Sequence, residues 1–513
     1  MQPPDSQPDS QPDPQPDPQP DSQPGPQRDP RRRPGRHADP ARDASVLAWF
    51  VHAAERGNPY AQFNLALLYK NGAGVARDDG LACLWLARAA RQRLAFAQNH
   101  LGSMYSQGRG VARSDSLAAY WFGLAAEQGD ASAQQNLGDL YRKGRGVPRQ
   151  PDQAVAWYYK AAEQDLASAQ RLLGECYLNG EGVAVNHALA MAWFRKAAVL
   201  EDAAAEVELG LMYRRGQGLA GGVPAGNGSS PGNGARGEAE ALHWFRRAAG
   251  RGYPAAQRLL GLACLEGVAG CDPQGAYTWL QCAARQGDAE AQFSLGQLLS
   301  GGKGGSGHCD EGRALAWTTR AAEQGHVLAQ YSLGNMYAHG RGVARDPARA
   351  LHWYRMAAEQ GAPNAQFTLG VMYAHGQGVR RDESAAVAWY RRAAEQGDAS
   401  AQNNLGVMYA NGQGVGQDDA CAVHWYGLAA EQGHALAQYN LGGMYNSGRG
   451  VERDTVRSYM WMLLAADAGD PAASANKAIV ARRLSPQQID SAVDMQRAWR
   501  RARTVESPER RAA

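Results

Sequence analysis

The chain has 513 residues, of which 44% are apolar and 20% charged, a balance typical of a folded protein. Its net charge of only +3 gives no indication of a nucleic-acid partner, and no apolar stretch approaches the length of a membrane span. Seven cysteines without regular spacing argue against a disulfide framework and favour a reducing compartment. Only Cys264 and Cys271 lie close together, and we expect two buried thiols there rather than a bridge.

Residues 1–42 differ in composition from the rest of the chain. The segment PDSQPDSQPDPQPDPQPDSQ has almost no apolar side chain and a proline every few positions, which predicts a disordered tail with polyproline II character. An Arg-rich stretch follows it, and we interpret this stretch as a solvated tail rather than a binding site. No apolar signal-peptide segment follows Met1, so the sequence predicts a cytoplasmic protein; a different start would leave export open.

A repeat of about 36 residues begins after this tail. Twelve of the thirteen tryptophans recur at intervals of 36, 36, 36, 36, 51, 35, 38, 36, 36, 36 and 36 residues, from Trp49 to Trp461. An Ala-Gln pair recurs with matching intervals from Ala61 to Ala437, although the fifth copy has Glu206 in place of glutamine. The two markers define a half repeat at 43–57 and eleven complete repeats at 58–469.

Each repeat is predicted to contain two helices. In the tenth repeat Ala401, Leu405 and Met408 form one face of a first helix, which stops at a Gly-x-Gly-Val sequence typical of a left-handed C-cap. Three residues after that valine stands a residue that we expect to be the N-cap of the second helix, as in the series Asp78, Ser114, Gln150, Asn186, Asp346, Asp382, Asp418 and Asp454.

We expect the second helix to present a face of Trp425, Ala429 and Ala430, with the indole opposite small Ala and Gly surfaces, so that the helix docks into the next repeat. Neither helix can bury its apolar face alone, so the copies must stack into an all-α solenoid.

Two repeats contain irregular loops, and the chain ends differently from the repeats. The fifth repeat carries a Gly/Ser/Pro-rich insertion at about 219–237, which we expect to be flexible, and the seventh contains SGGKGGSGHCDEG in the same loop. A last first-type helix is expected at 470–482. Residues 483–513 are then predicted to form an amphipathic capping helix, with Ser485 as N-cap and Pro486 at its first position, followed by a basic tail.

The repeated pattern, A-x-A-Q-x-x-L-G-x-M-Y-x-x-G-x-G-V-x-x-D followed by W-Y/F-x-x-A-A-E-Q-G, resembles the Sel-1-like repeat, a relative of the tetratricopeptide repeat. The resemblance covers about residues 43–482. It implies a right-handed superhelical solenoid of eleven helix-turn-helix repeats with a C-terminal capping helix, and a role as an adaptor for protein partners. The chain lacks the one-pair-per-repeat cysteines of the secreted members, which counts against that subset.

No residue set supports catalysis, a cofactor or a metal. His243, His352 and His424 each precede a tryptophan on a second helix, where single histidines without partners build no metal site. His308-Cys309-Asp310 lies in a Gly-rich loop, and such adjacent groups rarely hold an ion. The recurring Gly-x-Gly follows a helix and lacks the Gly-Lys-Ser/Thr of a phosphate loop, so we interpret it as a helix cap.

The first helices offer a candidate partner surface opposite Ala401 and Leu405, around Asn403, Val407 and Ala410. At the Asn403 position of the later repeats stand several aromatic residues, and the candidate partner-binding residues are Phe293, Tyr331, Phe367, Asn403 and Tyr439. Packing between adjacent first helices is the alternative interpretation of these side chains.

Three functions are therefore weighed. The preferred one is a non-catalytic adaptor that binds a protein or peptide on the concave surface. An exported, envelope-associated receptor for a glycan or host ligand is the alternative. An RNA-binding repeat protein is a distant third, because the face positions are not regularly polar or basic. The partner's identity and the oligomeric state stay open.

Overall fold

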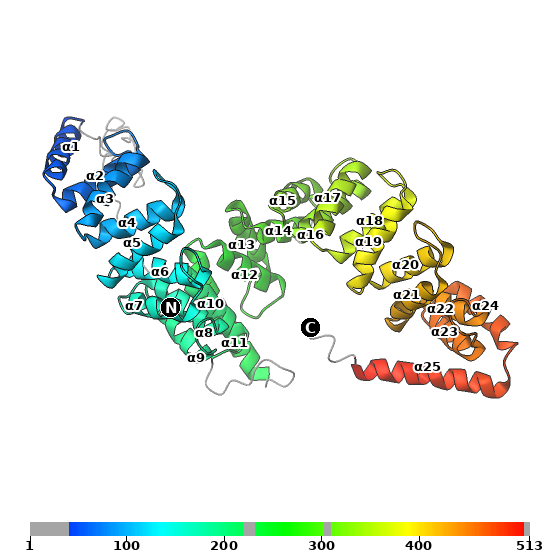
Figure 1. The fold of residues 1–513 in the computed structure, drawn as a ribbon. Coiled ribbons are helices and arrows are strands. Elements are labelled where there is room, and N and C mark those ends of the chain that lie inside the picture. Colours follow the sequence, from blue (N-terminus) through cyan, green and yellow to red (C-terminus); the bar gives the residue numbers. More distant parts are fainter. Residues whose placement is uncertain (1–39, 219–230, 302–308, 507–513) are drawn as a thin grey trace, which may run out of the picture. The chain divides into compact units, whose positions relative to one another are not determined.

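The computed structural model describes residues 40–218, 231–301 and 309–506, and every helix or strand assigned within these ranges is an α-helix (Figure 1). The predicted tail up to residue 39 and part of the predicted insertion lie outside the described residues. The chain divides into two compact units, Met1–Trp157 and Tyr158–Ala513, and each is described by itself.

The helices of the first unit, with the one that spans the division, are α1 (Pro40–Glu55), α2 (Pro59–Asn71), α3 (Asp79–Arg91), α4 (Ala95–Gln107), α5 (Asp115–Glu127), α6 (Ala131–Lys143) and α7 (Pro151–Ala162). Those of the second unit are α8 (Ala167–Asn179), α9 (His187–Val199), α10 (Ala203–Arg214), α11 (Pro231–Gly250), α12 (Pro254–Leu265), α13 (Pro273–Arg285), α14 (Ala289–Ser300), α15 (Glu311–Glu323), α16 (Val327–His339), α17 (Pro347–Glu359), α18 (Pro363–His375), α19 (Glu383–Glu395), α20 (Ala399–Asn411), α21 (Asp419–Glu431), α22 (Ala435–Ser447), α23 (Thr455–Asp467), α24 (Pro471–Ala481) and α25 (Pro486–Glu506).

The even-numbered helices from α2 to α22 are the first helices of repeats 1 to 11, and each following odd-numbered helix is the second helix of that repeat. From α1 to α6 in the first unit and from α8 to α24 in the second, each helix packs against the next one in the chain, so that the repeats stack in sequence (Figure 1). Helix α1 begins at Pro40, three residues before the predicted half repeat, and α11 begins at Pro231, inside the range expected for the insertion. Both helices begin at a proline, which is well accommodated in the first turn of a helix.

The Gly-x-Gly-Val sequence ends each regular first helix, as predicted. Gly412 is left-handed at φ 67°, and its N–H donates to the carbonyl of Met408. The second glycine has another role, because a Cβ on Gly414 would lie 2.3 Å from the backbone carbonyl of Glu383 in the preceding repeat. This glycine therefore allows two repeats to approach backbone to backbone. The Gly-x-Gly-Val sequence therefore both ends the first helix and forms the contact with the preceding repeat.

The indole of the second helix was expected opposite small Ala and Gly side chains where one repeat docks into the next, but the glycine surface of the first helix meets a different ring. A Cβ on Gly406 of α20 would lie 2.7 Å from the ring of Tyr426, which is 4% exposed, so Tyr426 and not Trp425 faces the small surface of the first helix. Trp425 is half-buried and packs against a cluster that contains Tyr390 of α19 and Leu405 of α20. The indole of Trp425 therefore contacts the preceding repeat, whereas the ring of Tyr426 fills the space between the two helices of its own repeat.

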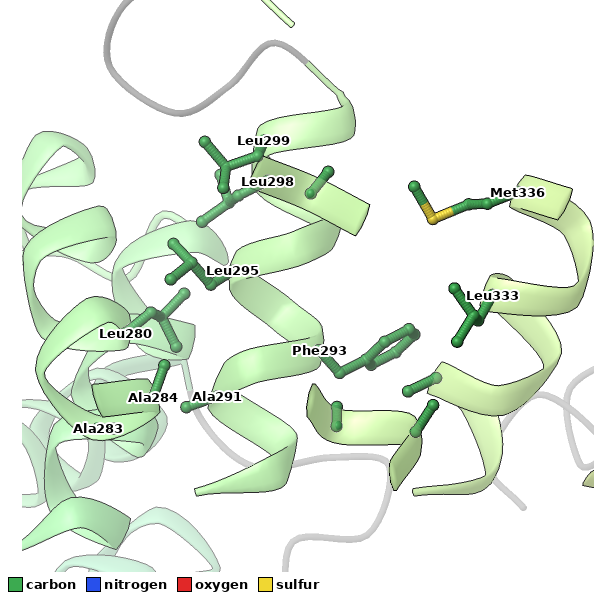
Figure 2. Close-up of a cluster of buried hydrophobic side chains, with 14 residues drawn as sticks. Leu280, Ala283, Ala284, Ala291, Phe293, Leu295, Leu298, Leu299, Leu333 and Met336 are labelled. Atoms are coloured by element: carbon green, nitrogen blue, oxygen red, sulfur yellow. The ribbon is translucent and has the colours of Figure 1, made fainter. Parts of the chain in front are cut away.

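One of the larger apolar clusters shows how first helices also meet each other. Leu280 of α13 and Leu295 of α14 pack together, and Phe293 points from α14 toward Leu333 of α16 (Figure 2). Phe293 is only 5% exposed. The ring therefore fills the space between the first helices of repeats 7 and 8.

A ladder of glutamine side chains crosses the repeat junctions. Gln366 at the start of α18 is buried, and its Nε2 donates to the carbonyl of Ala358 in the last turn of α17. Its Oε1 accepts from Gln396 at the end of α19, over 2.8 Å. We call each such bond from one glutamine side chain to the other a rung. The same bond joins Gln62 to Gln92, Gln98 to Gln128, Gln257 to Gln286, Gln292 to Gln324, Gln330 to Gln360 and Gln402 to Gln432.

Repeat 6 contains a disulfide between Cys264 and Cys271, which corrects the expectation of two separate thiols. Cys264 lies in the last turn of α12 and Cys271 in the following loop, which lacks the Gly-x-Gly-Val sequence. The loop folds Cys271 back onto the cluster that contains Cys264, which brings the two side chains together. Five other cysteines are free.

The C-terminal helix α25 covers the last repeat, as predicted. Ser485 and Gln488 form a capping box, since each side chain bonds the other residue's backbone N–H. The helix packs against α23, with Trp499 against Trp461 at a ring-centre distance of 6.2 Å. Trp499 Nε1 also donates to the Glu431 carboxylate over 2.8 Å. Helix α25 thus packs against the second helix of the last repeat.

Candidate protein-binding surface

The five candidate partner-binding residues are not equally accessible. Phe293 and Asn403 are 5% and 2% exposed, so the expectation that their positions form an open face was wrong for these two. Both lie between neighbouring first helices, where Asn403 Oδ1 accepts a hydrogen bond from Asn440 over 3.0 Å. Ala410, at 9% exposure, is also buried.

Tyr331, Phe367 and Tyr439 are half-buried. The rings of Tyr331 and Phe367 lie 5.6 Å and 5.9 Å from those of Tyr354 and Tyr390. Packing thus accounts for part of each aromatic surface, and a role in binding stays a prediction for all five candidates.

Tyr439 lines a groove. This groove, of about 540 Å³, lies on the first-helix side of repeats 10 and 11. Its walls come from α20, α22 and α24, and include Val407, Asn440, Asn476 and Ile479. Apolar side chains and carboxamides alternate here, a mixture suited to a peptide that presents both main chain and side chains.

A second hollow of about 690 Å³ lies between α16, α17 and α18 of repeats 8 and 9. It occupies the same place in its repeats, because seven of its lining residues have counterparts 72 positions later in the first groove. The seven are Asn335, Ala338, His339, Tyr354, Thr368, Met372 and Gln377, and the counterparts are Val407, Ala410, Asn411, Tyr426, Asn440, Met444 and Arg449. The hollow is therefore a periodic feature of the stacking.

Hydrogen bonds hold the walls of the groove in repeats 10 and 11. Asn476 Nδ2 donates to the hydroxyl of Tyr439 over 2.9 Å. Arg449 donates through Nε and Nη2 to Asp419 and also to the carbonyl of Ala410, over 3.0 Å. The guanidinium of Arg449 keeps the pKa of Asp419 below its usual range, so this ion pair persists at neutral pH. Burial raises the pKa of Tyr426 to about 12, so that hydroxyl is neutral.

Sequence reasoning missed most of the groove residues, among them Asn440, Asn476 and Arg449. A signal was present, because Asn404, Asn440 and Asn476 recur at one register position on three successive first helices. Three polar residues at one position predict a polar row on the helix surface, but not the depth of the hollow beside it.

The described ranges contain no group of three or more His, Cys, Asp or Glu side chains that could hold a metal ion. Asp310, weighed with Cys309 as a possible ion ligand, is the N-cap of α15 and accepts from the N–H of Arg313. Among the helices of these same ranges, none combines the length and the apolar character needed to cross a lipid bilayer.

These features define the class of the protein: an α-helical repeat protein with one helical hairpin per repeat. The Sel1 repeat profile matches residues 59–94, 95–130, 131–166, 167–200, 203–253, 254–288, 289–326, 327–361, 363–398, 399–434 and 435–470. The chain belongs to the Sel1 repeat family. Proteins of this family generally mediate protein–protein interactions and are typically non-catalytic.

The chain is also similar to proteins of solved structure, of which the first described here supports the assignment. The chain is similar to c5321 of uropathogenic Escherichia coli, described as a protective antigen displaying an SLR fold, with 33% identity, coverage of 88% of this chain and 94% of that chain, and a TM-score of 0.59. It is also similar to a Sel1 repeat protein from Oxalobacter formigenes, with 30% identity, coverage of 69% and 88%, and a TM-score of 0.36. No curated protein matches the sequence.

Proposed function

We propose that this protein is a non-catalytic cytoplasmic adaptor that binds a protein partner along the first-helix surface of repeats 8–11. The observation that carries the proposal is the pair of hollows at equivalent places two repeats apart. Hollows repeated along a stack can accept successive segments of one partner, and the family's general role in protein–protein interaction supports this use.

The partner is expected to be an extended peptide segment. The groove between α20, α22 and α24 presents the carboxamides of Asn440 and Asn476 beside apolar side chains. A carboxamide has a donor and an acceptor side by side, as a peptide bond does, so it can bond a main chain without reading its sequence. Apolar neighbours such as Ile479, which is 53% exposed, then contact the partner's side chains.

The test is quantitative affinity capture with the full-length protein and two matched variants. Ile479→Arg places a charge in the groove, whereas Leu428→Arg changes a 40% exposed leucine on α21, outside the groove. We expect Ile479→Arg to reduce recovery of the partner at least fivefold and Leu428→Arg to leave it unchanged. Equal recovery with all three proteins contradicts binding at this surface.

An exported receptor is the second candidate, and two observations favour it. The solved protein c5321, 33% identical to this chain, is described as a protective antigen. The Cys264–Cys271 disulfide is also a feature more common in oxidising compartments. Cell fractionation separates the candidates, because recovery from the periplasm or the cell surface contradicts the cytoplasmic adaptor.

A further inference from the structure

The two equivalent hollows differ in electrostatic character. In the groove of repeats 10 and 11, Arg449 and Asp419 neutralise each other across the repeat junction. The same positions in repeats 8 and 9 hold Gln377 and Pro347, both of which line the hollow. The ion pair beside the groove of repeats 10 and 11 is therefore replaced by two uncharged residues at the hollow of repeats 8 and 9.

This replacement leaves Arg345 without an acidic partner. In repeats 1, 2 and 9 the arginine before the N-cap pairs with an acid two residues later, as Arg77 pairs with Asp79 at 3.0 Å and Arg113 with Asp115 at 3.3 Å. In repeat 8 that later position is Pro347. Arg345 is exposed, lines the hollow, and has no ion pair with any residue of the described ranges.

The rest of the lining adds donors and no carboxylate. The hydroxyl of Tyr354 donates to Asn335 Oδ1 over 2.8 Å, which fixes the carboxamide and leaves its N–H groups for a ligand. The amide of Gln377 and the ring of His339 line the same hollow, and no Asp or Glu does. A guanidinium with amide donors around it suits a carboxylate, which accepts in the plane of its two oxygens.

We propose that the hollow between α16, α17 and α18 binds a glutamate or aspartate side chain of a partner peptide, with Arg345 as its ion-pair partner. The proposal rests on the proposed function, since it assigns an acidic residue to the segment that binds along repeats 8–11. The hollow has room for more than a carboxylate, and Ala338 and Met372 offer apolar contacts to neighbouring groups. One unpaired cation favours a single carboxylate over a polyanion such as RNA.

The test uses the full-length protein and two fluorescein-labelled, C-terminally amidated octapeptides of Gly and Ser, one with three glutamates and one with three glutamines. Fluorescence anisotropy at low salt gives their affinities. We expect the glutamate peptide to bind at least tenfold more tightly. Equal affinity for the two peptides overturns the proposal, as does complete displacement of the glutamate peptide by equimolar inorganic phosphate.

Three variants locate the site. Arg345→Gln removes the cation, and Pro347→Asp gives Arg345 the internal partner that Arg77 has in Asp79, so each should weaken binding of the glutamate peptide at least fivefold. Asp is the native first residue of α3, α5 and α21, which makes Pro347→Asp compatible with folding. Arg453→Gln changes the equivalent arginine of repeat 11, which lines neither hollow, and should have no effect. Unchanged binding in both Arg345→Gln and Pro347→Asp overturns the assignment.

The two proposals fail in distinguishable ways. If the glutamate peptide does not prefer the wild-type hollow while Ile479→Arg still abolishes capture of the partner, only the carboxylate site is wrong. If capture of the partner is insensitive to Ile479→Arg, the adaptor function at this surface is wrong, whatever the peptide affinities.

Discussion

The carboxamide oxygen of Gln170 lies buried without a hydrogen-bond partner, because Leu200 stands where other repeats place the donating glutamine. In repeat 9 the equivalent pair is Gln366 and Gln396, which bond over 2.8 Å. Gln170 still donates to the carbonyl of Ala162 over 3.1 Å, so the bond to the backbone is kept and only the glutamine–glutamine bond is lost. A buried acceptor without a hydrogen bond lowers stability, because folding removes the water that bonds this oxygen in the unfolded chain and supplies no replacement.

Leu200→Gln should complete this rung. Leu200 is 42% exposed, so the replacement gives up little apolar burial and gains a bond to Gln170 Oε1. We expect the free energy of unfolding to rise by about 1 kcal/mol, measured by urea denaturation. Leu428→Gln, at a similarly exposed leucine with no orphaned acceptor, is the control and should not stabilise. A loss of stability in Leu200→Gln would contradict the ladder.

In repeat 5 an ion pair replaces the glutamine–glutamine hydrogen bond, and this predicts how single and double substitutions will affect stability. Glu206 takes the glutamine position, is fully buried, and pairs with Arg251 and with Arg247 at 2.8 Å. Arg247 also donates to the carbonyl of Ala198, which the missing glutamine would otherwise cap. Glu206→Gln alone leaves two guanidinium groups beside a neutral amide and should cost about 2 kcal/mol.

The double variant Glu206→Gln/Arg251→Gln should recover much of that loss, because it recreates the Gln–Gln rung of the other repeats. Chemical denaturation of the four proteins of the cycle gives the coupling energy between the two positions. Additive losses would show that Glu206 and Arg251 act independently and would refute the compensation.

Much of this fold is predictable from the sequence, because a 36-residue period of Trp, Ala-Gln and Gly-x-Gly leaves little choice of architecture. The expectation that the indole of Trp425 lies opposite the glycine surface was wrong because adjacent residues on a helix differ by about 100° in direction. Either Trp425 or Tyr426 satisfies the apolar pattern, and only packing against Gly406 decides between them.

The candidate site was less predictable. The hollow at Arg345 depends on Pro347 and Gln377, which lie in different repeats and lack the charge of their counterparts Asp419 and Arg449. A missing charge gives no positive signal in a single sequence. Likewise, Asn403 looked exposed on a helical wheel but is buried by the neighbouring first helix, where Asn440 bonds it.

The turn after each second helix predicts a stabilising substitution. Most repeats have glycine there, such as Gly129 at φ 92°, but repeat 1 has Arg93 at φ 63°. A side chain in this left-handed region is strained, so Arg93→Gly should stabilise the protein by about 0.5 kcal/mol, after the added freedom of the unfolded glycine is subtracted. The reverse change at the equivalent position, Gly129→Arg, should destabilise it. Thermal melts of both variants check the signs, and equal shifts in one direction would refute the explanation.

Reduction of the Cys264–Cys271 disulfide should destabilise repeat 6. The bond closes a short loop, and its loss should cost about 2 kcal/mol through the freedom gained by the unfolded chain. Peptide mapping after alkylation identifies the bond, and hydrogen exchange of residues 259–278 before and after reduction measures the local effect. Cys282→Ser, at a free cysteine of α13, should leave the response to reduction intact. Alkylation of both Cys264 and Cys271 in oxidised protein would show that the bond does not form.

Two first helices, α16 and α22, are capped by histidine where six others have an Asp or Asn cap, and this predicts a pH dependence. Nδ1 of His434 accepts a hydrogen bond from the N–H of Ala437 over 3.2 Å, which requires an unprotonated Nδ1. Burial lowers the pKa of His434 below its ordinary value of 6.5, although Asp398 nearby partly opposes the shift. The unfolded chain therefore binds a proton more readily than the folded one. This contribution to stability is fully present above pH 6.5 and is lost as the pH falls through 6.5 toward the folded pKa.

Protonation also places a positive charge at the N-terminus of α22, where the helix dipole disfavours it. We therefore expect α22 to lose about 1 kcal/mol of capping energy between pH 7.5 and pH 5. In His434→Asp the carboxylate should keep the cap over this range, as Asp398 does for α20 through the N–H of Ala401. Hydrogen exchange of residues 435–447 in both proteins at the two pH values isolates this cap from the other titrating groups. An equal change in wild type and variant would mean that His434 does not control the stability of this helix.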